Sequence, residues 1–138
     1  MDFTEILKPG LRGESSTVVD DTNTAASWGS GGLPVYSTPC VVALLENACF
    51  RATKALLPEG WSTVGTEVNI SHLAPSPRGR TIRAFGELLE NNGRHLVFKV
   101  QVYDEIDGKQ NQLIAEGTHG RFIINSKKFL DKAEDKRE

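Results

Sequence analysis

The sequence predicts an α+β domain in which one long helix lies across a five-stranded antiparallel sheet. Two observations support this prediction. The run from Thr38 to Leu57 is almost uncharged in its first half, as buried helices are, and the segments after it alternate apolar and polar residues, as β-strands do. Because the turns between those segments are short, the strands must pair antiparallel, since parallel strands need long crossover connections.

Residues 9–19 are predicted to form the first strand, because the β-branched residues near its end favour extended backbone. The next stretch, from Asp20 to Tyr36, is polar, rich in glycine, and carries Trp28. Such a composition is typical of loops, and we expect a loop or a mobile lid there.

The long helix has recognisable signals at both ends. Ser37 or Thr38 can cap its first turn, and Pro39 suits that turn because the N–H that proline lacks would have no partner there. Pro58 ends the run after Leu57.

Four strands are predicted after the helix, over residues 64–72, 81–90, 96–103 and 112–124. Asn92-Gly93 is typical of a hairpin turn, and Asp107-Gly108 marks another reversal. In the first of these strands, Val64, Val68 and His72 are expected to share the apolar face.

The tail from Ser126 is charged and helix-prone, and we expect it to be frayed or solvated. This divides the chain into a domain over residues 1–125 and a tail over residues 126–138. One helix cannot cover a five-stranded sheet, and the sheet has edge strands to protect. We therefore expect a homodimer that buries the remaining apolar surface.

Composition excludes several classes of protein. With 138 residues, 38% of them hydrophobic and 25% charged, the chain is predicted to be one globular domain. A net charge of -2 argues against a nucleic-acid or membrane-surface protein, and no run approaches the roughly 20 apolar residues of a membrane span. The first residues lack a signal-peptide pattern.

The two cysteines are expected to be free thiols. Cys40 and Cys49 share one predicted helix and lie about 13 Å apart along it, which is too far for a disulfide bond. Free thiols are typical of the reducing cytoplasm, so we expect a cytoplasmic protein.

Glu46 is the most unusual residue of the helix. It is the only carboxylate between Asp21 and Glu59, and it interrupts an apolar segment. A buried carboxylate must be paired, hydrogen-bonded, protonated or facing a cavity. The pattern leaves two interpretations open: a structural hydrogen bond or partial exposure beside Asn47, or a functional acid.

His72 and Thr38 gain significance beside Glu46. A histidine on the apolar face of a strand is usually a satisfied core residue, but packing of the helix on this face would put His72 in the same layer as Glu46. Thr38 is either a simple helix cap or part of a helix start whose N–H groups and dipole can stabilise an oxyanion.

Other residues give weaker signals. Cys40 is a rival nucleophile near the helix start or a small core residue. Arg78 and Arg80, on a turn, are phosphate ligands or solvated charges, and the same ambiguity holds for His119 and Arg121 on the last strand.

The sequence carries no motif for a metal or a cofactor. The histidines lack the spacing of metal ligands, and phosphate-loop and dinucleotide motifs are missing, so we expect no metal or separate cofactor.

Three stretches carry a family resemblance that covers about residues 5–126. They are Ser37-Thr38-Pro39 with Glu46 eight residues after Thr38, the strand end 68–75 (VNISHLAP), and the closing segment 117–122 (GTHGRF). In these motifs the chain resembles the hot-dog thioesterases of the fluoroacetyl-CoA thioesterase family.

The resemblance implies hydrolysis of an acyl-CoA, with Thr38, Glu46 and His72 as the catalytic set and the N–H of Gly65 close to the acyl group. It also implies a homodimer whose active site lies at the subunit interface. Coenzyme A would enter only as part of the substrate.

Candidate substrate contacts come from the residues themselves as well as from the resemblance. By their chemistry alone, Arg78, Arg80 and Arg121 could bind coenzyme A phosphates. The lid of the fluoroacetate-specific enzyme carries phenylalanines, whereas the matching stretch here, residues 27–32, reads SWGSGG. Trp28 or Tyr36 would then close the acyl pocket.

The resulting hypothesis is hydrolysis of a short acyl-CoA. Glu46 attacks the thioester carbonyl or activates a water, Thr38 orients the carboxylate or the substrate, and His72 acts as acid or base. Two alternatives stay open: a hydratase or dehydratase of 3-hydroxyacyl thioesters, and a non-catalytic module that binds an acyl-CoA or a fatty acid.

Overall fold

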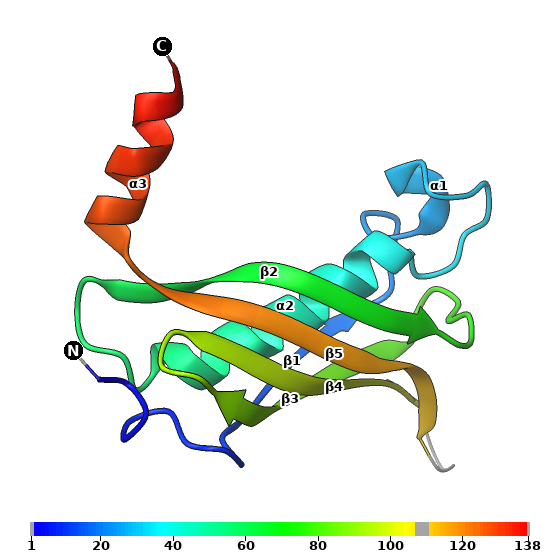
Figure 1. Cartoon of the computed structure of the whole chain (residues 1–138). Helices are drawn as coiled ribbons and strands as arrows, with labels where there is room; N and C mark the ends of the chain where they lie inside the picture. Colours follow the sequence, from blue (N-terminus) through cyan, green and yellow to red (C-terminus); the bar gives the residue numbers. More distant parts are fainter. Residues whose placement is uncertain (1, 107–110, 138) are drawn as a thin grey trace.

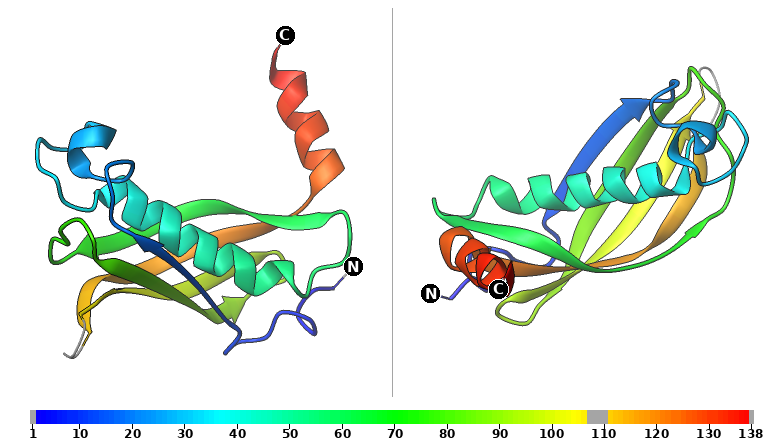
Figure 2. Two further views of the ribbon diagram at one scale, coloured as in Figure 1. Left: turned by 180° about the vertical axis from the view of Figure 1, so that it is seen from behind. Right: turned by 90° about the horizontal axis from the view of Figure 1, so that it is seen from above.

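The fold is a curved five-stranded sheet with one long helix across its concave face (Figures 1 and 2). The computed structural model describes residues 2–106 and 111–137. In chain order the elements are β1 (Arg12–Val18), α1 (Ala25–Trp28), α2 (Thr38–Lys54), β2 (Trp61–His72), β3 (Thr81–Asn91), β4 (His95–Glu105), β5 (Gln112–Asn125), α3 (Ser126–Glu134) and the 3₁₀ turn η1 (Asp135–Arg137).

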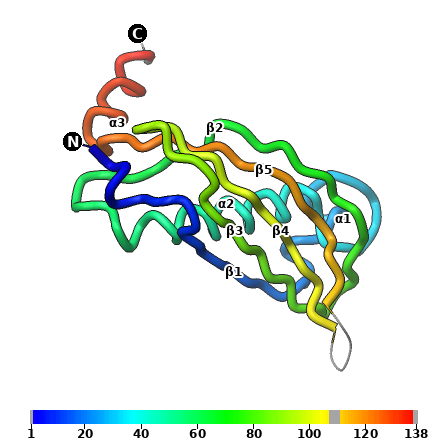
Figure 3. Tube along the Cα trace, turned by 60° about the horizontal axis from the view of Figure 1, so that its bottom comes forward, coloured from blue at the N-terminus to red at the C-terminus, as the bar shows by residue number. Residues whose placement is uncertain are grey.

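The predicted α+β class, with its antiparallel sheet, is confirmed. The strand order is β1-β3-β4-β5-β2, and all four neighbouring pairs are antiparallel (Figure 3). The Asn92-Gly93 turn joins β3 to β4, with Gly93 at a φ of 100° that favours glycine. The reversal expected at Asp107-Gly108 lies outside the described residues.

Some element boundaries differ from the prediction. The first strand begins at Arg12 instead of residue 9, and α2 ends at Lys54 instead of Leu57. The N–H groups of Leu56 and Leu57 both donate to the carbonyl oxygen of Thr53, which closes the helix in a turn. The predicted helical tail forms α3, which has no buried residue and projects past the β2 edge (Figure 1).

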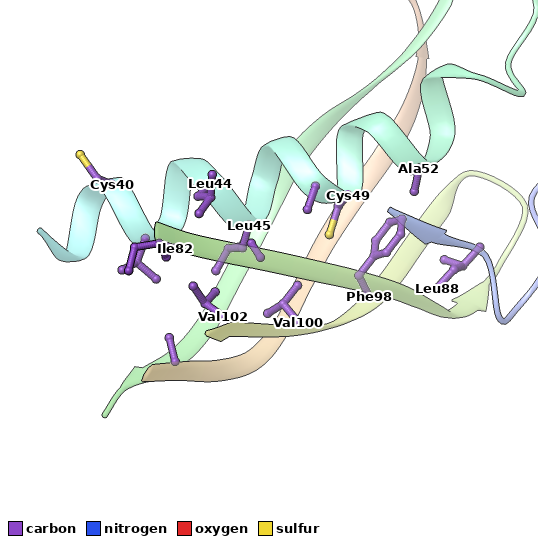
Figure 4. Close-up of a cluster of buried hydrophobic side chains, with 14 of the residues drawn as sticks. Cys40, Leu44, Leu45, Cys49, Ala52, Ile82, Leu88, Phe98, Val100 and Val102 are labelled. Carbon is purple, nitrogen blue, oxygen red and sulfur yellow. The ribbon is translucent and has the colours of Figure 1, made fainter. Parts of the chain in front are cut away.

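The core lies between α2 and the sheet. Buried residues of α2 recur every three or four positions, so one face of the helix meets the sheet. Figure 4 shows this layer, which includes Leu45, Cys49, Ile82, Leu88, Phe98, Val100 and Val102.

Two glycines let α2 approach the sheet closely. Gly13 of β1 and Gly86 of β3 are paired directly opposite each other. A Cβ on Gly13 would collide with the backbone of Ala48 and lie 2.8 Å from the Cβ of Ala52, and one on Gly86 would lie 2.5 Å from the Sγ of Cys49. Small residues on both surfaces therefore determine the distance between α2 and the sheet, and with it how far each α2 side chain lies from the strands.

A β-bulge in β2 corrects one prediction. The register with β5 shifts between Gly65 and Glu67, so Gly65 pairs with Arg121 and Val68 pairs with His119. Val64, by contrast, pairs with the partly exposed Phe122 on the outer face. Placing Val64 on the same face as His72 was therefore wrong, because the extra residue of a bulge reverses the alternation of side chains.

The edge strand β2 is incompletely covered. Residues 65–69 are all exposed, and Val68, which points to the helix side, remains 38% exposed. Val42, Glu46 and Phe50 form a half-buried stripe along α2. Among the described residues, no helix is long and apolar enough to cross a membrane.

Candidate active site

The start of α2 holds the first part of the site. Ser37 is the helix cap, and its hydroxyl accepts a hydrogen bond from the N–H of Cys40. Thr38 is therefore not needed as a cap. Its Oγ1 lies 2.7 Å from Nδ1 of His72, at the end of β2, so a helix start and a strand end are joined by one hydrogen bond.

His72 is positioned for proton transfer. Its Nε2 is buried and has no hydrogen-bond partner among the described residues. Burial lowers the pKa of His72, so the ring is neutral at pH 7. A neutral imidazole fixed at Nδ1 leaves Nε2 as the atom that can exchange a proton with a substrate.

A small hollow opens beside this pair. Its volume is about 270 Å³, and its lining comes from the start of α2, the end of β2 and the 20–36 loop: Ala25, Ser30, Val35, Tyr36, Thr38, His72, Leu73, Ala74 and Pro75. The loop is fixed over the β2–β3 turn by bridges that join Thr24 to Tyr36 and Val35 to Pro77.

Glu46 forms the second part of the site. Its side chain is 39% exposed and lies against Gly65, where an added Cβ would collide with Oε2 of Glu46. Nη1 of Arg121 lies 3.6 Å from Oε2, and Nε2 of His119 lies 3.8 Å from it. A carboxylate reachable from solvent thus faces a buried cation and an imidazole.

The two parts are separate within one protomer. Among the contacts of the described residues, Glu46 makes none with Thr38 or His72. Thr38 and Glu46 are eight residues apart on α2, which corresponds to about 12 Å along the axis. Residues between Gly65 and His72 separate the two parts along β2 as well.

Arg121 and His119 lie under Glu46. Arg121 is 5% exposed, and it donates through Nε to Oγ1 and through Nη2 to the carbonyl oxygen of Thr63, both at 2.8 Å. His119 is fully buried beside it. The Arg121 guanidinium therefore faces the carboxylate instead of the solvent.

The other predicted contacts lie around the loop. Trp28 is 53% exposed, and its Nε1 donates to the carbonyl oxygen of Thr22 at 2.6 Å. Tyr36 lines the hollow but is buried, and its hydroxyl donates to the carbonyl oxygen of Cys40 at 3.0 Å. Arg78 is exposed and paired with Asp21 at 2.6 Å.

The cysteines are free and buried, as the sequence predicts. Burial raises the pKa of Cys49 to about 12, so its thiol is neutral at pH 7. Cys40 lines a different hollow, beside Ser15 and Asn47, and not the one that contains Thr38 and His72. No group of three possible metal ligands occurs within residues 2–106 and 111–137.

Thr63 and the pairing of His119 with Arg121 were not predicted from the sequence. A partial signal exists, because His119 and Arg121 alternate in Gly117-Thr118-His119-Gly120-Arg121-Phe122 and must share one face of the strand. That this face is the one under Glu46 depends on the strand order.

A Gly65→Ala substitution is expected to lower kcat/KM by about 100-fold, because the new methyl group displaces the Glu46 carboxylate and small misplacements of reacting groups are costly. Steady-state thiol release from an acyl-CoA measures the loss. Gly120→Ala is the matched control, since its Cβ would meet only the side chains of Thr66, His95 and Glu67, at 3.1 Å or more. Equal activity of the Gly65→Ala variant and wild type would contradict the placement of Glu46.

Comparisons with known proteins identify the family of this chain. Residues 19–127 match the family described as FlK, fluoroacetyl-CoA-specific thioesterase. The chain is 35% identical over 102 residues to the fluoroacetyl-CoA thioesterase of Streptantibioticus cattleyicolor, covering 74% of this chain and 70% of that protein.

Solved structures show the same fold. A mutant of FlK in complex with acetyl-CoA superposes with a TM-score of 0.85 at 29% identity, covering 96% of this chain and 100% of the other. A hot-dog-like protein from Thermanaerovibrio acidaminovorans superposes with a TM-score of 0.87 at 18% identity, covering 100% and 98% of the two chains, and supports the fold alone. The chain therefore belongs to the fluoroacetyl-CoA-specific thioesterase family, and it is a thioester hydrolase with the hot-dog fold.

Proposed function

We propose that this chain hydrolyses short acyl-CoA thioesters with Thr38, Glu46 and His72 as its catalytic set. The observation that carries the proposal is the hydrogen bond between Thr38 Oγ1 and His72 Nδ1 at 2.7 Å, beside the hollow at the start of α2. The His72 imidazole can transfer a proton, and the start of α2 beside it can polarise a thioester carbonyl, so both groups lie at one place.

The proposed reaction needs one nucleophilic oxygen. Glu46 supplies it directly, by attacking the thioester carbonyl, or indirectly, by taking a proton from a water that attacks. The α2 start and the N–H of Gly65 stabilise the oxyanion. In the direct route the C–S bond breaks to leave an acyl–Glu46 anhydride and a thiolate; Nε2 of the neutral His72 takes a proton from a water that attacks the anhydride and passes this proton to the thiolate. In the indirect route the C–S bond breaks as the attacking water adds, and the proton that Glu46 took from the water passes through Nε2 of His72 to the thiolate. Both routes give the carboxylic acid and coenzyme A and regenerate Glu46.

The separation of Glu46 from His72 supports a homodimer with composite sites. In such a dimer the β2 strands of the two subunits would pair antiparallel, centred on the exposed residues 65–69. The end of one β2 strand that carries His72 would then lie beside the part of the partner's β2 strand that carries Gly65. Glu46 then meets Thr38 and His72 of the partner subunit. The same pairing would cover the half-buried stripe of Val42 and Phe50. It would also give hydrogen-bond partners to the free N–H and C=O groups of the β2 edge.

The hollow favours a short acyl group. Its volume of about 270 Å³ is below the range usual for drug-sized ligands. Two relatives are named for, or bound to, two-carbon acyl thioesters, fluoroacetyl-CoA and acetyl-CoA. In this proposal Tyr36, which lines the hollow, borders the acyl group, and Arg78 and Arg80 on the β2–β3 turn bind coenzyme A phosphates. Trp28 lies on the same loop, outside the lining of the hollow.

Free-thiol release from a series of acyl-CoAs with two to eight acyl carbons tests the proposal. We expect kcat/KM to be highest for the two- to four-carbon substrates and to fall with each added methylene, because the hollow must hold the thioester and the adjoining part of coenzyme A together with the acyl chain. Absence of thiol release from every member by folded protein would overturn the proposal. Hydration of an enoyl-CoA, followed by the loss of its ultraviolet absorbance, would identify a hydratase instead.

A further inference from the structure

The closing strand contains a buried polar cluster to which the proposed reaction assigns no role. His119 of β5 is 0% exposed, and its Nδ1 lies 2.7 Å from the carbonyl oxygen of Glu67, next to the bulge of β2. A carbonyl oxygen only accepts hydrogen bonds, so Nδ1 of His119 carries a proton.

The other nitrogen of His119 must act as an acceptor. Its Nε2 lies 3.1 Å from Nη1 of Arg121, and a guanidinium only donates. The imidazole is therefore neutral, in agreement with the direction of its pKa, which is lowered first by burial and also by Arg121. The 3.8 Å approach of Nε2 to Glu46 is accordingly no ion pair.

Arg121 has two possible partners for the same nitrogen. Its Nε and Nη2 are bound to Thr63, which fixes the plane of the guanidinium. Nη1 then donates to His119 at 3.1 Å and stays 3.6 Å from Oε2 of Glu46, beyond a normal hydrogen bond. The cation therefore lies beside the carboxylate but does not occupy its lone pairs.

We propose that His119 is a positioning residue that holds the Arg121 guanidinium back from Glu46. By accepting the Nη1 hydrogen bond, it leaves the carboxylate oxygens of Glu46 free to act as a nucleophile or base. This inference rests on the proposed role of Glu46. It adds that the reactivity of Glu46 depends on the distance at which the hydrogen bond to His119 holds the guanidinium from the carboxylate.

Among the described residues, Arg121 is the one cation in ion-pair contact with Glu46. Arg121 and His119 face it from β5, the Cys49 thiol from α2 itself, and Gly65 from β2. Phe50 covers the guanidinium, with its ring centroid 6.0 Å from the central carbon. If Nη1 lost its bond to His119, the Glu46 carboxylate would close the 3.6 Å gap and accept from it, because a buried donor rarely stays without an acceptor.

Two amide variants separate the hydrogen bonds of His119. The side chain of a His119→Asn variant reaches only the Nδ1 position, so it keeps the bond to Glu67 and leaves Arg121 without its acceptor. The longer side chain of His119→Gln reaches the Nε2 position and can accept from Arg121. Neither variant adds volume to the core.

In the His119→Asn variant we expect the acidic limb of the kcat/KM pH profile to shift to lower pH by about one pH unit, because Arg121 then pairs directly with Glu46. The kcat value should fall about tenfold as the carboxylate loses basicity, with KM changed by less than about threefold. The His119→Gln variant should keep the wild-type limb. In an Arg121→Gln background, His119→Asn should cause no further downward movement.

An acidic limb that stays in place or moves to higher pH in the His119→Asn variant overturns the inference, and so does an equal downward movement in the Arg121→Gln background. A purely structural His119 would lower the melting temperature of both amide variants without moving the limb. Full activity of a Glu46→Gln variant would instead refute the proposed function, so the two failures are distinguishable.

Discussion

A Glu46→Gln variant is expected to hydrolyse acyl-CoA at least about 1000-fold more slowly than wild type, with little change in stability. The amide keeps the size of the side chain above Gly65 but can neither attack a thioester nor accept a proton. Because the side chain is 39% exposed, an uncharged replacement can be solvated, and the fold is expected to persist. Thiol release under saturating acyl-CoA measures the effect.

Glu59→Gln is the matched control, since Glu59 is an exposed carboxylate just beyond α2 and lies outside the site. It should keep wild-type kcat. If the Glu46→Gln variant retains more than about a tenth of the wild-type kcat, Glu46 is neither nucleophile nor general base. After a single turnover in ¹⁸O-water, label in the Glu46 carboxylate would identify direct attack, because only an anhydride opened at its Glu46 carbonyl takes up the label.

The second large effect is recovery of activity when two inactive variants are mixed. Glu46→Gln and His72→Ala homodimers should each be inactive. If Glu46 acts with His72 of the partner subunit, a mixed dimer contains one intact site and one site lacking both residues. Random exchange of subunits should then restore about a quarter of the wild-type activity.

A mixture of Thr38→Ala with His72→Ala provides the control for this experiment. Thr38 and His72 of one protomer are hydrogen-bonded to each other, so neither site of that mixed dimer is intact. It should recover nothing. Failure of the Glu46→Gln and His72→Ala mixture to recover, with subunit exchange confirmed by a mass-tagged chain, would mean that each site lies within one protomer.

Much of the fold could be predicted from the sequence, because its signals are local. Ser37, Pro39 and Pro58 mark the ends of the long helix, and alternating residues mark the strands after it. The class, the antiparallel pairing and the sheet-facing helix follow from those patterns and from short connections. A carboxylate in an uncharged helix likewise attracts attention without any knowledge of its neighbours.

What the sequence determined by itself was therefore the set of elements and the unusual residues on them: Thr38 at a helix start, Glu46 within the helix and His72 at a strand end. The tertiary structure decided which of them meet. It paired Thr38 with His72, and it placed Arg121 and His119 of β5 under Glu46.

The physical reason is that these contacts depend on strand register and helix height, which no local pattern encodes. One extra residue at the β2 bulge turns Gly65 and Val68 to the same face. The facing pair Gly13 and Gly86 sets the distance of α2 from the sheet. Hydrogen bonds such as the one from Arg121 to Thr63 join residues 58 positions apart, and they form only after the chain has packed.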